Sequence, residues 1–236
     1  MPLNFEVLAY EETSLGILCL RRRLTLKEPQ QWVTEITLNH EFLMSSLHTD
    51  SERSLATLAL QRLTGRNLRI MVGGLGLGYT CAAAIDDPRV AQVQVIEFLA
   101  QVIDWLQAGL VPLSPQLVDE TRLSIVRGDV YQTLLADPST EEPVAELWDA
   151  ILIDVDHSPD DQLASLSHGF YSEFGLRQAT RHLSKQGVLA LWSYAGNQEL
   201  EDAMRRVFRL FDIVPITYEN QHVGESFTDW LFIGQR

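Results

Sequence analysis

Short apolar runs alternate along the chain with stretches in which apolar residues recur every three or four positions. Short apolar runs are typical of strands buried in a parallel sheet, and apolar residues that recur every three or four positions are typical of amphipathic helices. Strand-like runs cover residues 70–72, 91–96, 123–129, 148–154, 188–192, 213–218 and 230–233. The alternation predicts an α/β fold with a mostly parallel, seven-stranded sheet and helices on both faces. Because little separates the last two runs, we expect an antiparallel strand at one edge.

The first 48 residues follow a different pattern. Runs at 5–10 and 15–20 have strand character, and the polar segment between them predicts a β-hairpin, to which 32–38 adds a third strand. We therefore expect a small antiparallel β-sheet in residues 1–48 and a main domain in residues 49–236. Three strands without a covering helix must pack on something, either the main domain or a second copy of the chain. A homodimer is the expected assembly.

A glycine-rich stretch follows the first strand of the main domain. Gly73, Gly74, Gly76 and Gly78 come directly after the apolar run, and a helix is expected to begin near Leu77. Glycine lets the backbone turn tightly and lets a ligand lie against it, and helix N-termini offer unpaired N–H groups. Glycine turns are common, so this motif gains its meaning from the residues that follow it.

Acidic residues close the next three predicted strands. Glu97 follows the glycines by about twenty residues, where nucleotide-binding α/β folds hold the ribose hydroxyls. Asp129 and Asp154 close the third and fourth strands, and such strand ends line one edge of a parallel sheet. This pattern predicts a nucleoside site. The alternatives are an exposed acid for Glu97 and, for Asp129, the N-cap of a helix from Val130, a role compatible with ligand binding.

Composition narrows the range of partners. The 236 residues are 46% hydrophobic, enough for one sizeable core, and carry a net charge of −14 with a pI of about 4.7. This charge disfavours nucleic acids and anionic membranes and is compatible with a cationic substrate, although many proteins are acidic for solubility alone. Cys19 and Cys81 lack zinc-site spacing. With neither a signal sequence nor an apolar run of membrane-spanning length, a cytoplasmic protein is expected.

The order of these motifs resembles that of the spermidine/spermine synthase family. The resemblance rests on 72–74, Glu97, 128–129, 149–154, 170–171 and 187–191, and it covers about residues 55–191 well. It implies the Rossmann-like class I methyltransferase fold, preceded by a small N-terminal β-sheet. It also implies S-adenosylmethionine or decarboxylated S-adenosylmethionine as co-substrate and an amine or other cationic small molecule as acceptor.

The resemblance also implies roles for single residues. Gly73, Gly74 and Gly78 match the family's glycine loop, and Glu97 matches the acid that holds the ribose diol. Asp129 matches the acid that accepts from the adenine amino group. Asp154 matches the first Asp of the active-site loop, which receives the attacking amine.

The sequence also departs from the family. Gly76 stands where the family has an Asp that contacts the aminopropyl amine. The loop after Asp154 is one residue longer than the family's, which displaces its second acid, and residues 51–57 lack most of the polyamine-binding groups. The nucleoside half of the pattern is therefore kept and the polyamine half is reduced, which argues against spermidine synthase activity proper.

Transfer from a sulfonium requires an aligned nucleophile and, for an amine, a base. Asp154, Asp156 and His157 are the candidate catalytic residues. Asp156 and His157 can equally cap a loop. The three residues can also form a metal site, although the sequence shows no further residues at metal-ligand spacing. Tyr171, Trp192 and Tyr194 near strand ends are pocket or core residues. The leading hypothesis is a spermidine-synthase-like transferase that passes an aminopropyl or methyl group to an amine or other small acceptor. Methyl transfer and a nucleoside-binding protein without turnover remain open; against methyl transfer, Val72 stands where many methyltransferases carry an acid.

Overall fold

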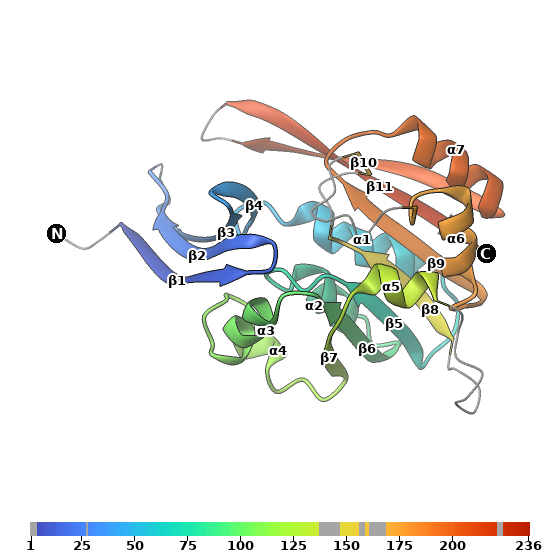
Figure 1. Cartoon of the computed structure of the whole chain (residues 1–236), viewed down its shortest axis with the longest axis horizontal. Coiled ribbons are helices and arrows are strands. Elements are labelled where there is room, and N and C mark those ends of the chain that lie inside the picture. The colour runs from blue at the N-terminus through green and yellow to red at the C-terminus, as the bar shows by residue number, and fades with distance from the viewer. Residues whose placement is uncertain (1–3, 27, 137–146, 156–158, 161–168, 221–223) are drawn as a thin grey trace.

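The computed structural model describes residues 4–26, 28–136, 147–155, 159–160, 169–220 and 224–236. Two sheets make up the fold, a four-stranded one near the N-terminus and a seven-stranded one in the main domain (Figure 1). The smaller sheet contains β1 (Phe5–Thr13), β2 (Gly16–Leu24), β3 (Trp32–Leu38) and β4 (Glu41–Ser45). The larger contains β5 (Leu68–Gly73), β6 (Val90–Glu97), β7 (Leu123–Arg127), β8 (Trp148–Ile153), β9 (Leu183–Ser193), β10 (Leu210–Asn220) and β11 (Glu225–Gln235).

The larger sheet has the strand order β10-β11-β9-β8-β5-β6-β7. Strands β9, β8, β5, β6 and β7 are mutually parallel, which confirms the predicted mostly parallel, seven-stranded sheet. The antiparallel strand, however, is not at the edge: β11 lies between β9 and β10. Its residues Leu231, Phe232 and Ile233 are fully buried, whereas Leu210 on β10 is exposed. The strand of the hairpin with the continuous buried apolar run, residues 231–233, therefore takes the inner position.

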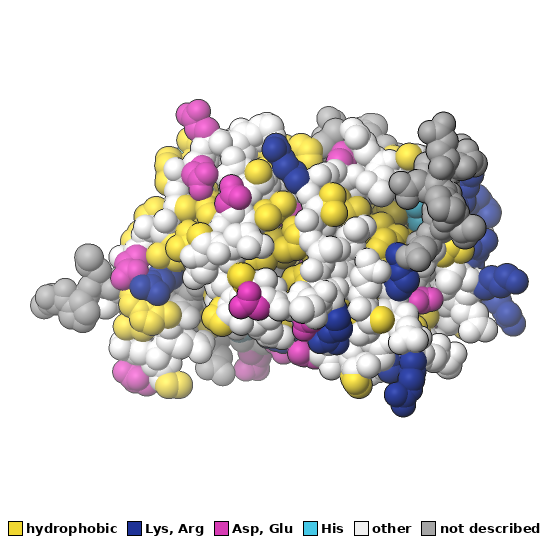
Figure 2. Space-filling model, turned by 90° about the horizontal axis from the view of Figure 1, so that it is seen from below, with side chains coloured by type: hydrophobic (Ala, Val, Ile, Leu, Met, Phe, Trp, Pro, Cys, Tyr) yellow, Lys and Arg dark blue, Asp and Glu magenta, His cyan; other side chains and the backbone are white. Residues whose placement is uncertain are grey.

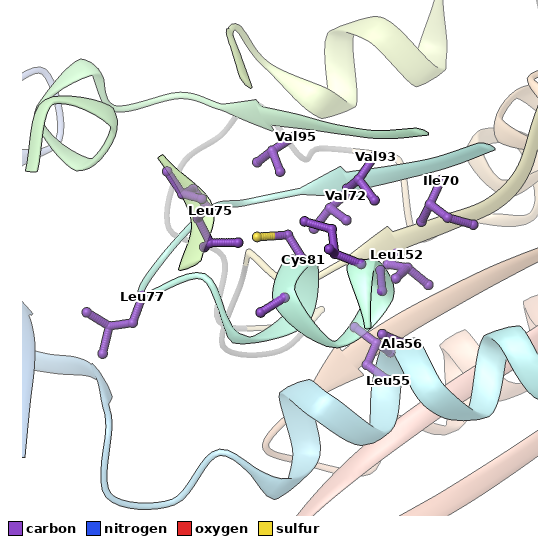
Figure 3. Packing of buried hydrophobic residues seen from close by; sticks show 14 of the residues in the cluster. Leu55, Ala56, Ile70, Val72, Leu75, Leu77, Cys81, Val93, Val95 and Leu152 are labelled. Carbon is purple, nitrogen blue, oxygen red and sulfur yellow. The ribbon is translucent and has the colours of Figure 1, made fainter. Parts of the chain in front are cut away.

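Helices cover both faces of this sheet and divide the core in two. The helices are α1 (Asp50–Gln61), α2 (Tyr79–Ile85), α3 (Ala100–Gln107), α4 (Ser114–Leu117), α5 (Val130–Leu135), α6 (Glu173–Thr180) and α7 (Gln198–Val207). On β5, Ile70 and Val72 pack with α1, α2 and α3, and Met71 between them packs with α5, α6 and α7. This alternation follows from the period of two along a strand. Figure 3 shows the first core, where Leu55 and Ala56 of α1 face the sheet.

The smaller sheet packs on the first of these cores. Leu18, Leu20, Ile36 and Leu38 are buried in the same cluster as α1 and α2. The indole N–H of Trp105 on α3 also donates to Glu11 Oε1 on β1 at 2.8 Å. The predicted boundary near residue 48 falls in the connection between β4 and α1.

Strand β4 was not expected from the sequence. It pairs with β3 through a two-residue turn in which Asn39 and His40 both have positive φ, 52° and 70°. Two positive φ angles define the hairpin turn that matches the twist of the strands, and glycine usually supplies at least one of them. Because this turn contains no glycine, its residues do not indicate a hairpin.

Local backbone geometry shifts the start of one predicted helix. Helix α2 begins at Tyr79 rather than near Leu77, because Gly74, Gly76 and Gly78 all have positive φ (89°, 51° and 92°) and keep the chain out of the helix. The segment 111–120 contains the short helix α4 with Pro115 in its first turn. Proline is well tolerated there because it lacks an N–H that would otherwise be unpaired.

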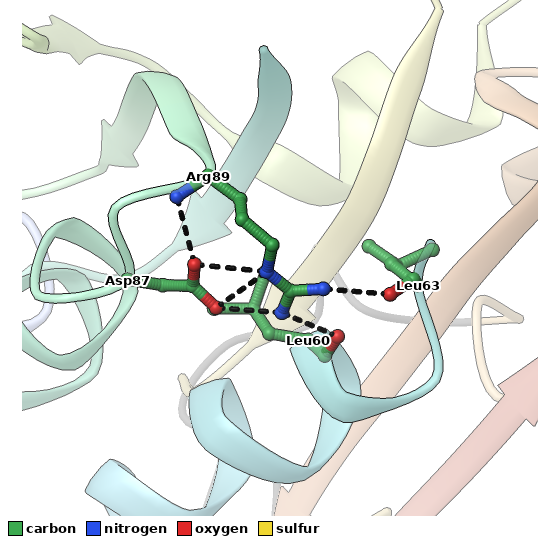
Figure 4. Close-up of polar contacts among 4 residues, drawn as sticks. All are labelled: Leu60, Leu63, Asp87 and Arg89. Carbon is green, nitrogen blue, oxygen red and sulfur yellow. Dashed lines mark hydrogen bonds and ion pairs between the residues drawn. The ribbon is translucent and has the colours of Figure 1, made fainter. Parts of the chain in front are cut away.

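One arginine ties the end of α1 to the turn before β6 (Figure 4). The Arg89 guanidinium donates to the carbonyl oxygens of Leu63 at 2.7 Å and Leu60 at 2.9 Å, and it pairs with Asp87 at 2.6 Å. Carbonyl groups at a helix end have no partner within the helix, so these bonds cap α1.

We expect Arg89→Lys to lower the free energy of unfolding by about 1–2 kcal/mol, because an ammonium group cannot reproduce the fork of contacts. Urea denaturation measures this change. Arg66→Lys, at an exposed position, is the matched control. Equal losses in the two variants would show that the cap contributes nothing.

Charge is unevenly distributed over the surface. On the face shown in Figure 2, most acidic side chains lie on the half with the smaller sheet and most basic ones on the other half.

Within the described part of the chain, none of the helices is long and apolar enough to cross a membrane.

Candidate functional site

Two adjoining cavities lie at the carboxyl ends of β5, β6 and β8, beneath the smaller sheet. The smaller has a volume of about 110 Å³ and an apolar lining that includes Glu97, Asp129 and Tyr131. The larger, of about 640 Å³, reaches from β4 and α1 to the hairpin β10–β11. Five residues are shared by the linings of the two cavities and mark their junction: Leu43, Met44, Gly76, Asp154 and Val155.

The four predicted glycines differ in what they do. Gly74 and Gly76 line the smaller cavity, Gly76 and Gly78 line the larger, and Gly73 lines neither. A Cβ atom on Gly73 would meet Val130 at 2.9 Å, and one on Gly78 would meet Leu117 at 2.6 Å. A Cβ atom on Gly74 would collide with the backbone carbonyl of Asp154, and one on Gly76 with Met44, so all four positions are closely packed, and Gly74, Gly76 and Gly78 also present backbone to the cavities.

Glu97 ends β6 and holds the glycine loop. Its Oε2 accepts from the N–H of Leu75 at 2.8 Å and its Oε1 accepts from the N–H of Leu99 at 2.7 Å. Burial raises the pKa of this carboxyl, and the backbone N–H groups oppose that rise. Each carboxylate oxygen can accept a second hydrogen bond, so the side chain can still bind a hydroxyl pair in the cavity.

Asp129 caps α5, as the alternative prediction required. Its Oδ1 accepts from the N–H groups of Tyr131 at 2.8 Å and Gln132 at 3.2 Å. Its Oδ2 is buried and has no hydrogen-bond partner among the described residues. Because a buried acceptor without a partner is unfavourable, this oxygen is suited to a donor group on a ligand in the smaller cavity.

Asp154 follows β8 and stands at the junction of the two cavities. Its Oδ2 accepts from the hydroxyl of Thr80 at 2.6 Å. Burial raises the pKa of Asp154 to about 6; the Thr80 hydrogen bond opposes this rise and the negative charge of Asp229 adds to it. A carboxyl group with this pKa can accept a proton near neutral pH.

Two further acids that we did not predict line the larger cavity. Glu52 lies on α1 and Asp229 on β11, and the hydroxyl of Ser51 is 2.9 Å from Glu52 Oε2 and 2.7 Å from Asp229 Oδ2. Burial, followed by the charge of Asp154, raises the pKa of Glu52 to about 8, and burial raises the pKa of Asp229. Because a serine hydroxyl carries one proton, the two short contacts are best satisfied when one carboxyl is protonated.

A sequence signal for both acids existed. Glu52 precedes Leu55, Ala56 and Ala59 by three, four and seven residues, so it lies on the buried face of α1. Asp229 is in phase with Leu231 and Ile233, whose side chains face the first core. An acid in a predicted apolar stripe is the signal that would have found them.

The raised pKa of Glu52 predicts a pH dependence of stability. Its folded-state pKa, about 8, lies above the ordinary value of 4.5, so its stabilising contribution is complete below about pH 4.5 and is lost as the pH rises through about 8. Glu52→Gln keeps a neutral group there. We expect this variant to lie within about 1 kcal/mol of the native protein near pH 5 and to exceed its unfolding free energy by about 4 kcal/mol at pH 9.

Urea titrations between pH 5 and 9 measure this difference. Glu41→Gln, which removes the same charge from an exposed position on β4, is the control. A constant gap between Glu52→Gln and the native protein across this range would refute a protonated Glu52.

The predicted aromatic residues are divided between cavity and core. Trp192 and Tyr194 line the larger cavity, whereas the hydroxyl of Tyr171 lies 2.9 Å from that of Tyr131 and Tyr171 packs on the second core. The hairpin β10–β11 adds Tyr218 and Phe227 to the lining of the larger cavity, with His48 stacked on Tyr218 at a ring distance of 4.7 Å. These rings give the acidic cavity apolar walls.

The remaining catalytic candidates fall outside the described residues. Asp156, His157 and most of the loop after them cannot be placed relative to the two cavities. The roles predicted for these residues, and the metal-site alternative that involved them, stay predictions.

No family model matches the sequence, and no curated protein sequence matches it. Two solved structures superpose on nearly the whole chain. A spermidine synthase in complex with the transition-state analogue AdoDATO has a TM-score of 0.72 at 14% sequence identity, with 97% of this chain and 73% of that chain covered. Spermidine synthase from Thermotoga maritima has a TM-score of 0.69 at 13% identity, with 97% and 72% covered. The chain therefore has a spermidine synthase-like fold, as the motifs predicted.

Proposed function

We propose that this protein is a transferase that binds an S-adenosyl nucleoside in the smaller cavity and passes an aminopropyl group to an amine in the larger cavity. The observation that carries the proposal is the junction of the two cavities at Asp154. One cavity has acceptors suited to a nucleoside, and the other is lined by acids suited to a cation. The spermidine synthase-like fold supports the same pairing of substrates.

The nucleoside is expected to lie between Asp129 and Glu97. The buried Oδ2 of Asp129, which has no partner within the described residues, is suited to the adenine amino group, a donor. The buried carboxylate of Glu97 is suited to the two adjacent hydroxyls of a ribose. The apolar residues between them, among them Ile96 and Val130, suit the faces of the adenine ring.

Charge supports a cationic acceptor and an aminopropyl arm without a carboxylate. Glu52, Asp154 and Asp229 line the larger cavity, and Arg23 is the one Lys or Arg among the described residues that line it. That arginine is already paired with Glu35 at 2.6 Å. An added carboxylate would face Asp154 and Asp229 without a free cation, whereas an ammonium group would be attracted to these acids and would favour the ionised form of Glu52, which is neutral at pH 7 in the free protein.

The transfer itself is a displacement at carbon. The amine nitrogen forms a bond to the carbon next to the sulfonium, the carbon–sulfur bond breaks, and its electron pair stays on sulfur to give methylthioadenosine. The attacking amine must lose one proton, and Asp154 is the acceptor that the geometry supports. The Thr80 hydroxyl holds Asp154 Oδ2, which leaves Oδ1 for the amine. Alignment of the two substrates at the junction supplies much of the acceleration.

Methyl transfer from S-adenosylmethionine is the second candidate, and one observation favours it. No acid occupies position 76, so the loop does not repel the carboxylate of this co-substrate there.

The predicted homodimer belongs to the proposal as well, since the edge strand β1 exposes Phe5 and Val7.

The test is identification of the product nucleoside by mass spectrometry. The purified protein is incubated with decarboxylated S-adenosylmethionine or S-adenosylmethionine and a panel of mono-, di- and polyamines. Methylthioadenosine formed only when an amine is present is the expected result. Formation of S-adenosylhomocysteine instead would show that the reaction is methyl transfer rather than aminopropyl transfer. The absence of both products with every amine would contradict a transferase.

A further inference from the structure

Met44 on β4 lies at the junction of the two cavities. It is one of the five residues that line both, and it comes from the smaller sheet, whereas Gly76 and Asp154 come from the main domain. Its side chain is half-buried and packs on the first core. A group that reaches from the smaller cavity into the larger one must pass between these residues.

A β-bulge turns Met44 toward the cavities. In the pairing of β3 with β4, Ile36 is opposite Met44 and Thr37 is opposite Phe42, so Leu43 has no partner in the register. Successive side chains of a regular strand point to opposite faces, but a bulge reorients one of them. Here the consecutive residues Leu43 and Met44 both line the two cavities.

The Met44 thioether fills the place that a side chain on residue 76 would take. A Cβ atom on Gly76 would lie 2.7 Å from both Cε and Sδ of Met44. This is closer than carbon and sulfur atoms approach without displacement, so residue 76 and Met44 compete for one space. The glycine at position 76 and the methionine at position 44 therefore form a matched pair.

We propose that Met44 is the specificity-determining residue for the substituent on the sulfur of the bound nucleoside. This inference rests on the proposed function, because it requires the ribose at Glu97 and the sulfur at the junction. The polarisable, flexible thioether contacts a methyl or methylene group on that sulfur and offers it no charge. Recognition of the substituent on this side is therefore by contact area, while, among the described residues, Asp154 is the one acid at the junction and Glu52 and Asp229 lie beyond it in the larger cavity.

Calorimetric binding of adenosine and methylthioadenosine tests this assignment, because the two ligands differ only at the 5′ substituent. For Met44→Ala we expect the affinity for methylthioadenosine to fall about tenfold and that for adenosine to change less than about twofold. Met44→Leu, which keeps the volume, should stay within about threefold for both ligands. An unchanged ratio of the two affinities in Met44→Ala, or an equal drop of the ratio in Leu43→Ala, would overturn the assignment.

A double-mutant cycle with position 76 tests the matched pair separately. Gly76→Asp places a side chain at a positive φ in both backgrounds, but it should weaken methylthioadenosine binding more in the native background than in the Met44→Ala background, because the space is then open. Equal effects in the two backgrounds would contradict competition for one space. Melting temperatures of all variants identify any that fail to fold.

The two proposals fail in different ways. If the native protein binds both ligands and Met44→Ala leaves their ratio unchanged, the role of Met44 is wrong and the nucleoside site stands. If the folded native protein binds neither ligand, the nucleoside site is wrong and the role of Met44 falls with it.

Discussion

Replacing Asp154 by asparagine is expected to lower kcat of the group transfer by a factor of about 10² to 10⁴. The amide cannot accept the proton of the attacking amine, but it keeps the shape of the side chain and can still accept the hydrogen bond from Thr80. Nucleoside affinity should change less than about twofold, since the smaller cavity binds the nucleoside through other residues. Initial rates and calorimetry on the same preparation separate the two effects. Full activity in Asp154→Asn would show that this carboxyl is not the proton acceptor.

The pH profile gives the same test a second readout. Because Asp154 must be ionised to accept a proton, the rate should rise as the pH increases through about 6, the value to which burial raises its pKa. Thr80→Val removes the hydrogen bond that lowers this pKa, so the rising limb should move to higher pH. A profile that is unchanged in Thr80→Val would assign the titrating group elsewhere.

Glu97→Gln is expected to raise the Kd for methylthioadenosine by about 10²-fold. In the native protein both carboxylate oxygens accept from backbone N–H groups, those of Leu75 and Leu99. A glutamine has one acceptor oxygen, so its NH₂ group must face one of these N–H groups, and the ribose diol also loses an acceptor. The variant should therefore lose both nucleoside affinity and order in the glycine loop.

Asp129→Asn is the matched control for that experiment. Its Oδ1 can continue to accept from Tyr131 and Gln132, so α5 keeps its cap, while Oδ2 is replaced by an NH₂ donor. This variant should bind adenosine more weakly than the native protein does, but its affinity for inosine should not fall, because the inosine ring carries an acceptor where adenosine carries the amino group. Equal weakening of the two nucleosides, measured by calorimetry, would contradict the assignment of Asp129 to the adenine edge.

The sequence predicted the main sheet and the glycines and acids along one of its edges because those features depend on local patterns. The strands β5 to β9 are short apolar runs, and the glycines, Glu97, Asp129 and Asp154 stand at strand ends. The close approach of these residues at two adjoining cavities follows from parallel pairing alone. The departure at Gly76 was also readable, but its partner Met44 was not.

What the sequence did not predict depends on contacts between distant segments. Glu52 and Asp229 are 177 positions apart, and the Ser51 hydroxyl joins them only once α1 packs on the face of the sheet toward which Asp229 on β11 points. Strand β4 was missed because Asn39 and His40 form its turn without glycine, and Met44 was missed with it. The segment 51–57, which lacks most of the family's polyamine-binding groups, still contributes Glu52 to the larger cavity, and Asp154 and Asp229 come from the end of β8 and from β11.

The most direct test of the two-cavity account is a comparison of methylthioadenosine with S-adenosylhomocysteine by calorimetry on the native protein. These are the product nucleosides of aminopropyl and methyl transfer, and they differ by a substituent that carries a carboxylate. We predict that methylthioadenosine binds at least tenfold more tightly, because the substituent of S-adenosylhomocysteine would enter a cavity lined by Glu52, Asp154 and Asp229. Binding of neither nucleoside to the folded protein would contradict the account.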